Sequence, residues 1–131
     1  MKRMELPAVY LLGALGYGAL ELLWRGYTHW SMLVLGGICF LLIYLLNTRL
    51  RMAVLKKWVL SASVITTLEY LCGCLVNLYL GWNVWDYSAM RGNLLGQICP
   101  QFMFLWFCLS IPCTLLSSGM HRLFCDRQVA K

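Results

Sequence analysis

Charged residues are scarce in this chain. Lys, Arg, Asp and Glu make up 12% of the 131 residues and hydrophobic residues make up 61%, whereas soluble domains have roughly 25% charged and about 45–50% apolar residues. A water-soluble domain of this size could not bury so much apolar surface. The sequence also has no polar linker, which predicts a single domain over residues 1–131.

The sequence lacks the motifs of common enzymes and metal sites. It has no Ser-His-Asp arrangement, no phosphate-cradling loop and no zinc-ligand spacing. Cys72 and Cys74 would point about 200° apart on a helix, so they cannot share a metal ion. We therefore predict no enzymatic activity, no cofactor and no bound metal, and we interpret the seven cysteines as free, small, buried side chains.

A long basic arm or one-sided basic face is also missing. The eleven Lys and Arg residues stand in short clusters between apolar runs. This distribution argues against a nucleic-acid partner and is typical of loops that set the topology of a membrane protein.

Four long apolar segments remain. They lie at about residues 6–24, 31–46, 58–80 and 94–117, each near the roughly 20 residues that cross a bilayer as a helix. Strands would leave backbone groups unpaired in lipid. The sequence thus predicts an all-α polytopic protein of four transmembrane helices. The first segment lacks a small-residue cleavage site, so we expect it to be retained as a helix.

The basic residues predict the orientation. Two precede the first segment, four lie between the second and third, and three follow the fourth, against only Arg25 and Arg91 in the other two connections. Cytoplasmic loops carry the excess of Lys and Arg. We expect both termini on the cytoplasmic side of the cell inner membrane.

The two halves of the chain share an order of features. In each half a glutamate within an apolar segment, Glu21 or Glu69, is followed by a Trp-containing connection and a Leu-Gly-x-Ile-Cys run. Two helices per unit would give a parallel repeat, at about residues 6–48 and 57–118.

Glu69 lies near the middle of the third segment. A bare carboxylate there costs at least about 2.5 kcal/mol, so it must be protonated, paired or facing water. Helical spacing places Thr66, Glu69, Gly73 and Asn77 on one face. We expect this polar stripe to face the bundle interior and to bind a ligand, although it could also simply join helices by hydrogen bonds.

Glu21 lies four residues before Arg25. This spacing predicts an ion pair at the outer end of the first helix, with a structural role favoured over a ligand role. If the halves are related by pseudo-twofold symmetry, Glu21 and Glu69 approach each other and could hold a proton or a cation.

The second outer connection, at residues 81–93, combines aromatic and polar residues. Trp85 and Tyr87 form either an aromatic belt at the headgroup level or a folded lid over a central cavity. Asp86 and Arg91 could close the connection by pairing, and Asn93 could cap the fourth helix.

Gln97 and Gln101 would then lie one turn apart at the outer start of the fourth helix. They are expected to line a cavity beside the carbonyl freed by Pro100, with ordinary interhelical hydrogen bonding as the alternative. The glycines of the first two segments, which include Gly13, Gly16 and Gly36, are expected to allow close helix packing.

Three stretches carry a family resemblance: Leu68-Glu69-Tyr70, Trp85-Asp86-Tyr87-Ser88 and the run from Asn93 to Cys99. They resemble the signature of the bacterial ABC-transporter permease family of type IV, also called CmpB-like. The stretch from Glu21 to Met32 is similar to short Firmicute members of that family. The resemblance implies a membrane protein involved in transport.

These features predict a small permease or channel-like protein that binds a small polar or cationic species, and we expect it to work as a homodimer because four helices enclose little volume. The alternative is a non-transporting membrane module that binds a lipid, a peptide or a membrane protein through its outer aromatic loop. An enzyme acting on lipid is least favoured, because no nucleophile and base are recognisable. The candidate binding residues are Glu69, Glu21, Asn77, Asp86, Asn93, Gln97, Arg25, Trp85 and Tyr87.

Overall fold

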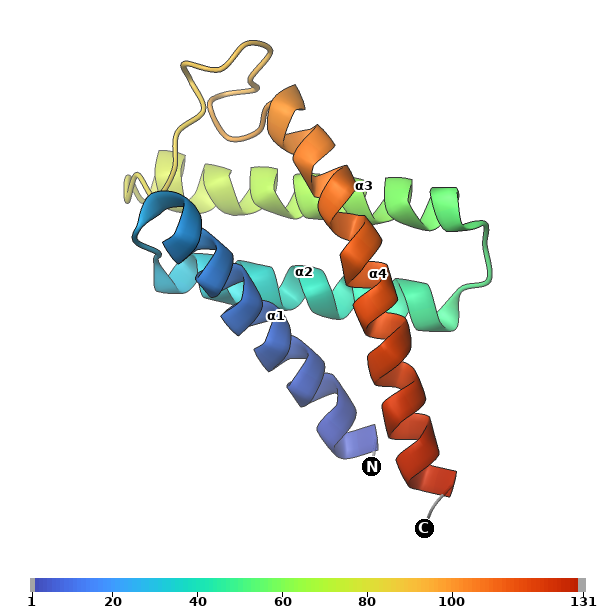
Figure 1. Cartoon of the computed structure of the whole chain (residues 1–131). Helices are drawn as coiled ribbons and strands as arrows, with labels where there is room; N and C mark the ends of the chain where they lie inside the picture. The colour runs from blue at the N-terminus through green and yellow to red at the C-terminus, as the bar shows by residue number, and fades with distance from the viewer. Residues whose placement is uncertain (1, 130–131) are drawn as a thin grey trace.

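The computed structural model describes residues 2–129, with side chains for residues 4–125. The helices are α1 (Lys2–Arg25), α2 (Trp30–Arg49), α3 (Val54–Gly73), its π-helical continuation η1 (Cys74–Tyr79), and α4 (Pro100–Val129) (Figure 1). Within these residues the extended structure is limited to one isolated bridge between Leu94 and Ile98. Four spans are long and apolar enough to cross a membrane. The predicted fold class is confirmed, and the chain is a multi-pass membrane protein.

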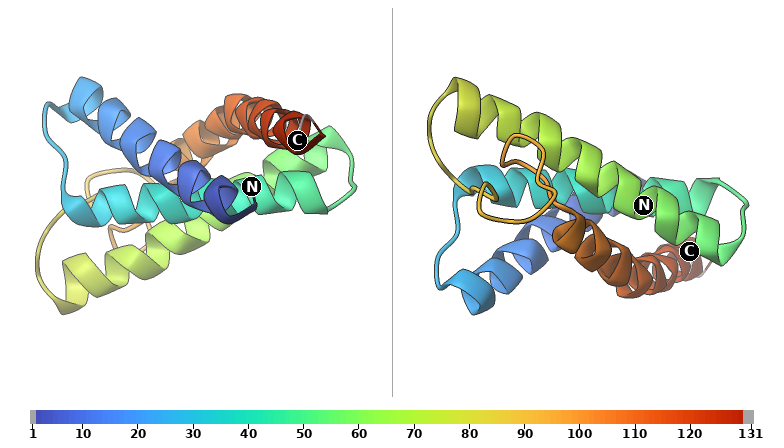
Figure 2. Two further views of the ribbon diagram at one scale, coloured as in Figure 1. Left: turned by 90° about the horizontal axis from the view of Figure 1, so that it is seen from below. Right: turned by 90° about the horizontal axis from the view of Figure 1, so that it is seen from above.

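The helices form two crossing layers. α2 and α3 lie side by side and run in opposite directions, and α1 and α4 cross them obliquely (Figures 1 and 2). The connections at residues 26–29 and 80–99 lie at one end of this pair, and the connection at 50–53 lies at the other. The start of α1 and the end of α4 lie near each other, on the side away from the long connection.

The largest difference from the sequence prediction concerns the start of α4. The helix begins at Pro100, where proline is favoured as a first helical residue. Residues 94–99 instead form a tight turn, in which Leu95 (φ 53°) and Gly96 (φ 74°) both have positive φ, as a type I′ turn requires. Gln97 N donates to Leu94 O (3.0 Å) and closes this turn. The prediction of a helix from residue 94 is therefore wrong.

Glycines set the contact between α1 and α2. A Cβ on Gly13 would lie 2.5 Å from the Cβ of Phe40, and a Cβ on Gly36 would lie 2.5 Å from the Cβ of Tyr17. The two backbones thus approach as closely as small residues allow in membrane helices. The close-packing prediction is confirmed at these positions and wrong for Gly16, where no atom lies within 4 Å.

We expect Gly13→Leu to lower the free energy of unfolding by about 1–3 kcal/mol, because the added side chain has no space against Phe40. Gly16→Leu on the same helix is the matched control and should not destabilise the protein. Unfolding in mixed detergent and SDS micelles, followed by circular dichroism, measures both. Equal destabilisation by the two variants would contradict the packing described here.

Polar contacts join α4 to its neighbours at the other end of the bundle. Asn47 Nδ2 on α2 donates to Thr114 O (3.2 Å) and Ser118 Oγ (2.9 Å), and Trp58 Nε1 on α3 donates to Thr114 Oγ1 (3.1 Å). Interhelical hydrogen bonds of this kind hold membrane helices together where lipid supplies no hydrophobic driving force.

The single-domain organisation and the parallel repeat stay predictions.

Candidate functional site

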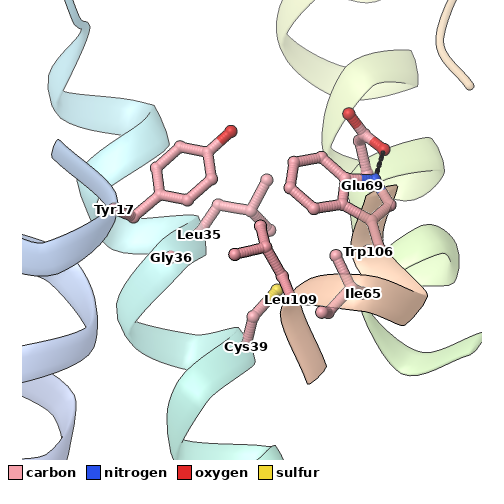
Figure 3. Close-up of a pocket in the computed structure, with 8 residues that line it drawn as sticks. All are labelled: Tyr17, Leu35, Gly36, Cys39, Ile65, Glu69, Trp106 and Leu109. Atoms are coloured by element: carbon pink, nitrogen blue, oxygen red, sulfur yellow. Dashed lines mark hydrogen bonds between the residues drawn. The ribbon is translucent and has the colours of Figure 1, made fainter. Parts of the chain in front are cut away.

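Glu69 lies inside the helix bundle, on α3, and is 2% exposed. Its Oε1 accepts a hydrogen bond from the hydroxyl of Tyr87 in the outer connection (2.8 Å). Its Oε2 accepts from Trp106 Nε1 on α4 (2.8 Å), as Figure 3 shows. Both donors are neutral. Among residues 4–125, the recorded ion pairs are Glu21–Arg25 and Glu5–His121, so Glu69 has no basic partner there.

The polar stripe continues from Glu69 toward the outer connection. Thr66 is 8% exposed and Gly73 is also buried. Asn77 follows within η1, where Leu80 N donates to Leu75 O (2.9 Å) across a wide turn. This stripe faces protein rather than lipid, as the helical spacing predicts.

Asn77 anchors the connection at residues 80–99. Its Oδ1 accepts from the backbone N of Val84 (2.7 Å) and of Trp85 (3.4 Å). Its Nδ2 donates to Gln97 Oε1 (2.7 Å). One amide side chain thus holds two separate parts of the connection, at residues 84–85 and 97, against the end of α3.

The connection folds inward over the helices. Trp85 and Gln97 are 5% and 2% exposed, and Trp85 Nε1 donates to Gln97 O (3.1 Å). Tyr87 stacks on Phe102 of α4 with ring centroids 4.6 Å apart. By contrast, Trp82 is 43% exposed. Trp85 and Tyr87 therefore belong to a loop packed into the bundle, which we call the re-entrant loop (residues 80–99).

Tyr87 is fixed as a proton donor. Burial, and then the negative charge of Glu69, raise the pKa of the Tyr87 hydroxyl above its ordinary value. The phenol therefore keeps its proton at neutral pH and can donate to the carboxyl group of Glu69.

Two predicted site residues shape the loop instead of contacting Glu69. Asp86 is exposed and its Oδ1 accepts from Ser88 N (2.9 Å), which lowers the pKa of the Asp86 carboxyl. In the described part of the chain Asp86 forms no ion pair with Arg91, so the predicted closure by pairing is wrong.

Asn93 does not cap α4, because the helix begins seven residues later. Its Nδ2 donates to Met90 O (2.7 Å) and its Oδ1 accepts from Gly96 N (2.9 Å). The amide therefore supports the tight turn that the sequence prediction placed inside the helix. Gln101, expected to line a cavity beside Gln97, is exposed on α4.

Glu21 and Arg25 form the predicted ion pair. Arg25 Nε lies 2.7 Å from Glu21 Oε2, and Arg25 Nη1 donates to Val84 O in the re-entrant loop (3.1 Å). The guanidinium also lies over the ring of Tyr27, 4.6 Å from its centroid. This pair thus fastens the outer end of α1 to the loop, as expected for a structural role.

A cavity of about 60 Å³ lies beside Glu69, between α1, α2, α3 and α4 (Figure 3). A volume of roughly 10–15 Å³ holds one water molecule, whereas sites for organic ligands measure about 300–1,000 Å³. In Figure 3 the hydroxyl of Tyr17 points across this space toward Glu69 and Trp106. The lining residues are Tyr17, Leu35, Gly36, Cys39, Ile65, Glu69, Trp106 and Leu109.

Sequence reasoning missed Tyr17 and Trp106. Tyr17 lies one helical turn before Glu21, so its position on the interior face could have been inferred from that spacing. Trp106 lies in an apolar run, and the signal for its inward position was Ser110, which lies four residues later on the same helical face and is buried.

A second, larger hollow of about 520 Å³ lies between α2 and the α3–η1 helix. It is almost entirely apolar, and Trp30 and Trp82 lie at its outer end. The rings of His29, Trp30 and Trp82 have centroids 5.5–5.7 Å apart. This hollow, which we call the aromatic-rimmed groove, lies apart from Glu69.

Comparison with known proteins identifies the family of the chain. No curated protein and no solved structure matches the chain. A protein family described as "Putative ABC-transporter type IV" matches residues 19–127. The matched range includes Glu21, Glu69, the re-entrant loop and Trp106. The chain therefore belongs to this ABC-transporter type IV family.

Proposed function

We propose that this protein is a small membrane permease or channel-like protein whose interior binds a small cationic species, a proton or a small inorganic cation, at Glu69. The family description supports a role in transport, and the position of Glu69 within the candidate membrane span Val54–Tyr79 supports binding at the depth of the bilayer.

One observation carries the proposal: Glu69 is buried in a membrane span, and its two hydrogen-bond donors, Tyr87 and Trp106, are both neutral. A carboxylate at this depth costs at least about 2.5 kcal/mol. Neutral donors offset part of that cost but leave the charge uncompensated. A proton or a cation on the carboxyl group removes it.

The size of the cavity supports a small species. About 60 Å³ beside Glu69 has room for a few water molecules or a partly hydrated ion and none for an organic solute. In this proposal Tyr87 orients the carboxyl group, while Asn77, Gln97 and Trp85 hold the re-entrant loop above it. Glu21 and Arg25 fasten the loop from α1, and Asp86 and Asn93 shape its outer surface.

The proposal includes a homodimer with both termini on the cytoplasmic side of the inner membrane. A single copy encloses too little space for a continuous path, so a route to Glu69 would run along an interface between two copies. The excess of basic residues at the termini and in the connection at residues 50–53 and its flanks supports the orientation.

Glu69→Gln in liposomes tests the proposal. The purified chain should raise the flux of protons or of K⁺ or Na⁺ above that of empty liposomes, and Glu69→Gln should reduce this flux at least about tenfold, because the amide binds neither a proton nor a cation at neutral pH. A pH-sensitive dye inside the liposomes and ion-selective electrodes outside measure the two kinds of flux. Light scattering on the purified protein in detergent, before it is placed in liposomes, gives the mass of the assembly.

Glu5→Gln is the matched control, since it makes the same chemical change at the opposite end of the bundle. It should leave the flux unchanged. Flux through Glu69→Gln equal to that of the original chain, or an original chain no more conductive than empty liposomes, would exclude the transport role.

A second candidate function, a non-transporting membrane module that binds lipid, a peptide or another membrane protein, is supported by the aromatic-rimmed groove. Such a module should bind equally well with glutamine at position 69. It would be identified by the absence of flux together with an intact fold.

A further inference from the structure

A second cluster of reactive side chains lies at the opposite end of the bundle from the re-entrant loop. Cys125 Sγ lies 3.6 Å from His121 Nε2, and His121 Nδ1 lies 3.3 Å from Glu5 Oε1. The hydroxyl of Tyr44 donates to the same carboxylate oxygen and lies 3.3 Å from His121 Nδ1. Three helices, α1, α2 and α4, thus supply the cluster.

The order of the hydrogen bonds assigns the protons. Glu5 Oε1 acts as an acceptor, so in this contact His121 Nδ1 carries the hydrogen and donates it. The lone pair of Nε2 then faces the thiol of Cys125 and can accept its proton. Glu5 stabilises the imidazolium that results.

The exposure of the three groups fits a reactive thiol. Cys125 is exposed, the side chain of His121 is 44% exposed, and that of Glu5 is only 14% exposed. The sulfur can therefore meet a reagent, while the carboxylate that orients the imidazole stays fixed. The six other cysteines form no hydrogen bond with a histidine within residues 4–125.

We propose that Cys125 is a reactive thiol that is modified by electrophiles and small disulfides, with His121 as the base and Glu5 as the positioning residue. A nucleophile beside a base that a third group orients is the arrangement that activates cysteines. With a small disulfide, the sulfur of Cys125 forms a new S–S bond and the disulfide's own S–S bond breaks. The thiol proton passes to His121 Nε2 and from there, directly or through water, to the released thiolate, which leaves the imidazole neutral again. The assignment is independent of transport.

Alkylation by iodoacetamide tests the assignment on the full-length protein in detergent at pH 7. Site-resolved mass spectrometry gives the rate at each cysteine. The comparison is a thiol moved to a neighbouring exposed position, Leu123→Cys with Cys125→Ser, because Leu123 is 53% exposed and residue 119, four positions earlier, is glycine. Cys125 should react about tenfold faster than this reference thiol, which has no base beside it.

Three variants test the roles within the cluster. His121→Gln should slow alkylation of Cys125 about tenfold, to the rate of the reference thiol, and Glu5→Gln should slow it by a smaller factor. Tyr44→Phe keeps both the imidazole and the carboxylate, so it should keep most of the fast rate. Circular dichroism verifies that each variant is folded. If Cys125 in the unsubstituted protein reacted no faster than the reference thiol, this result alone would overturn the proposal.

Discussion

Replacing Glu69 with leucine should lower the free energy of unfolding by about 1–3 kcal/mol, although the change makes a membrane helix more apolar. The reason is that Tyr87 and Trp106 would lose their shared acceptor and leave two buried donors unpaired. This loss is small for two unpaired buried donors because interhelical hydrogen bonds in membrane proteins contribute only about 0.6 kcal/mol on average. SDS-induced unfolding in mixed micelles measures the change.

Glu69→Gln separates stability from charge. Its side-chain carbonyl can still accept one of the two hydrogen bonds, so it should cost less than about 1 kcal/mol. Thr67→Leu, an exposed position two residues away on α3, is the control for added apolar volume and should stay within about 0.5 kcal/mol. If Glu69→Leu stabilised the protein, the donors would have found other partners and the site as described would not exist.

Substitution of Gly73 by leucine should expel the re-entrant loop from the bundle. A Cβ at this position would lie 2.9 Å from Trp85 Cζ2 and 3.0 Å from the Cβ of Gln97, so a larger side chain and the loop cannot occupy the same space. Overpacking of this kind costs typically 1–3 kcal/mol. Because about 1.4 kcal/mol is a tenfold change in an equilibrium constant, the population of the open loop should rise at least about tenfold.

Trypsin reports this opening, because Arg91 is an exposed cleavage site within the loop. Cleavage after Arg91 should be about tenfold faster in Gly73→Leu than in the original chain when opening limits proteolysis. Gly119→Leu on α4 is the matched control, since no atom lies within 4 Å of the added Cβ. Unchanged cleavage in Gly73→Leu would mean that the loop is not packed against α3.

The sequence was sufficient for the helices and for the interior face of α3. Hydropathy and length predict four spans because lipid permits few alternatives to a helix, and the spacing of Thr66, Glu69 and Gly73 predicts a shared face. Both are found in the structure. The Glu21–Arg25 pair could be predicted equally well, because a separation of four residues brings side chains together on any helix.

The boundary between the loop and α4 could not be read in the same way. Residues 94–99 are mostly apolar, and apolar residues are compatible both with a membrane span and with a turn buried between helices. The Leu95-Gly96 turn and Pro100 were the available signals. Misplacing this boundary gave Asn93 the role of a helix cap. Trp106, whose indole donates to Glu69, was not assigned a role at all.

The wide turn of η1 has a geometric consequence for the polar stripe. Eight residues of regular α-helix would rotate Asn77 about 80° away from the direction of Glu69, since each residue advances by 100°. Hydrogen bonds between residues five positions apart, such as that from Leu80 N to Leu75 O, fit an additional residue into the turn and remove most of this rotation. The wide turn thus accommodates one surplus residue and still keeps the carboxyl group and the amide that anchors the loop on one face. Deleting one residue from Cys74–Val76 would leave seven residues of regular α-helix, about 20° from alignment, with the amide closer to the carboxyl group along the helix.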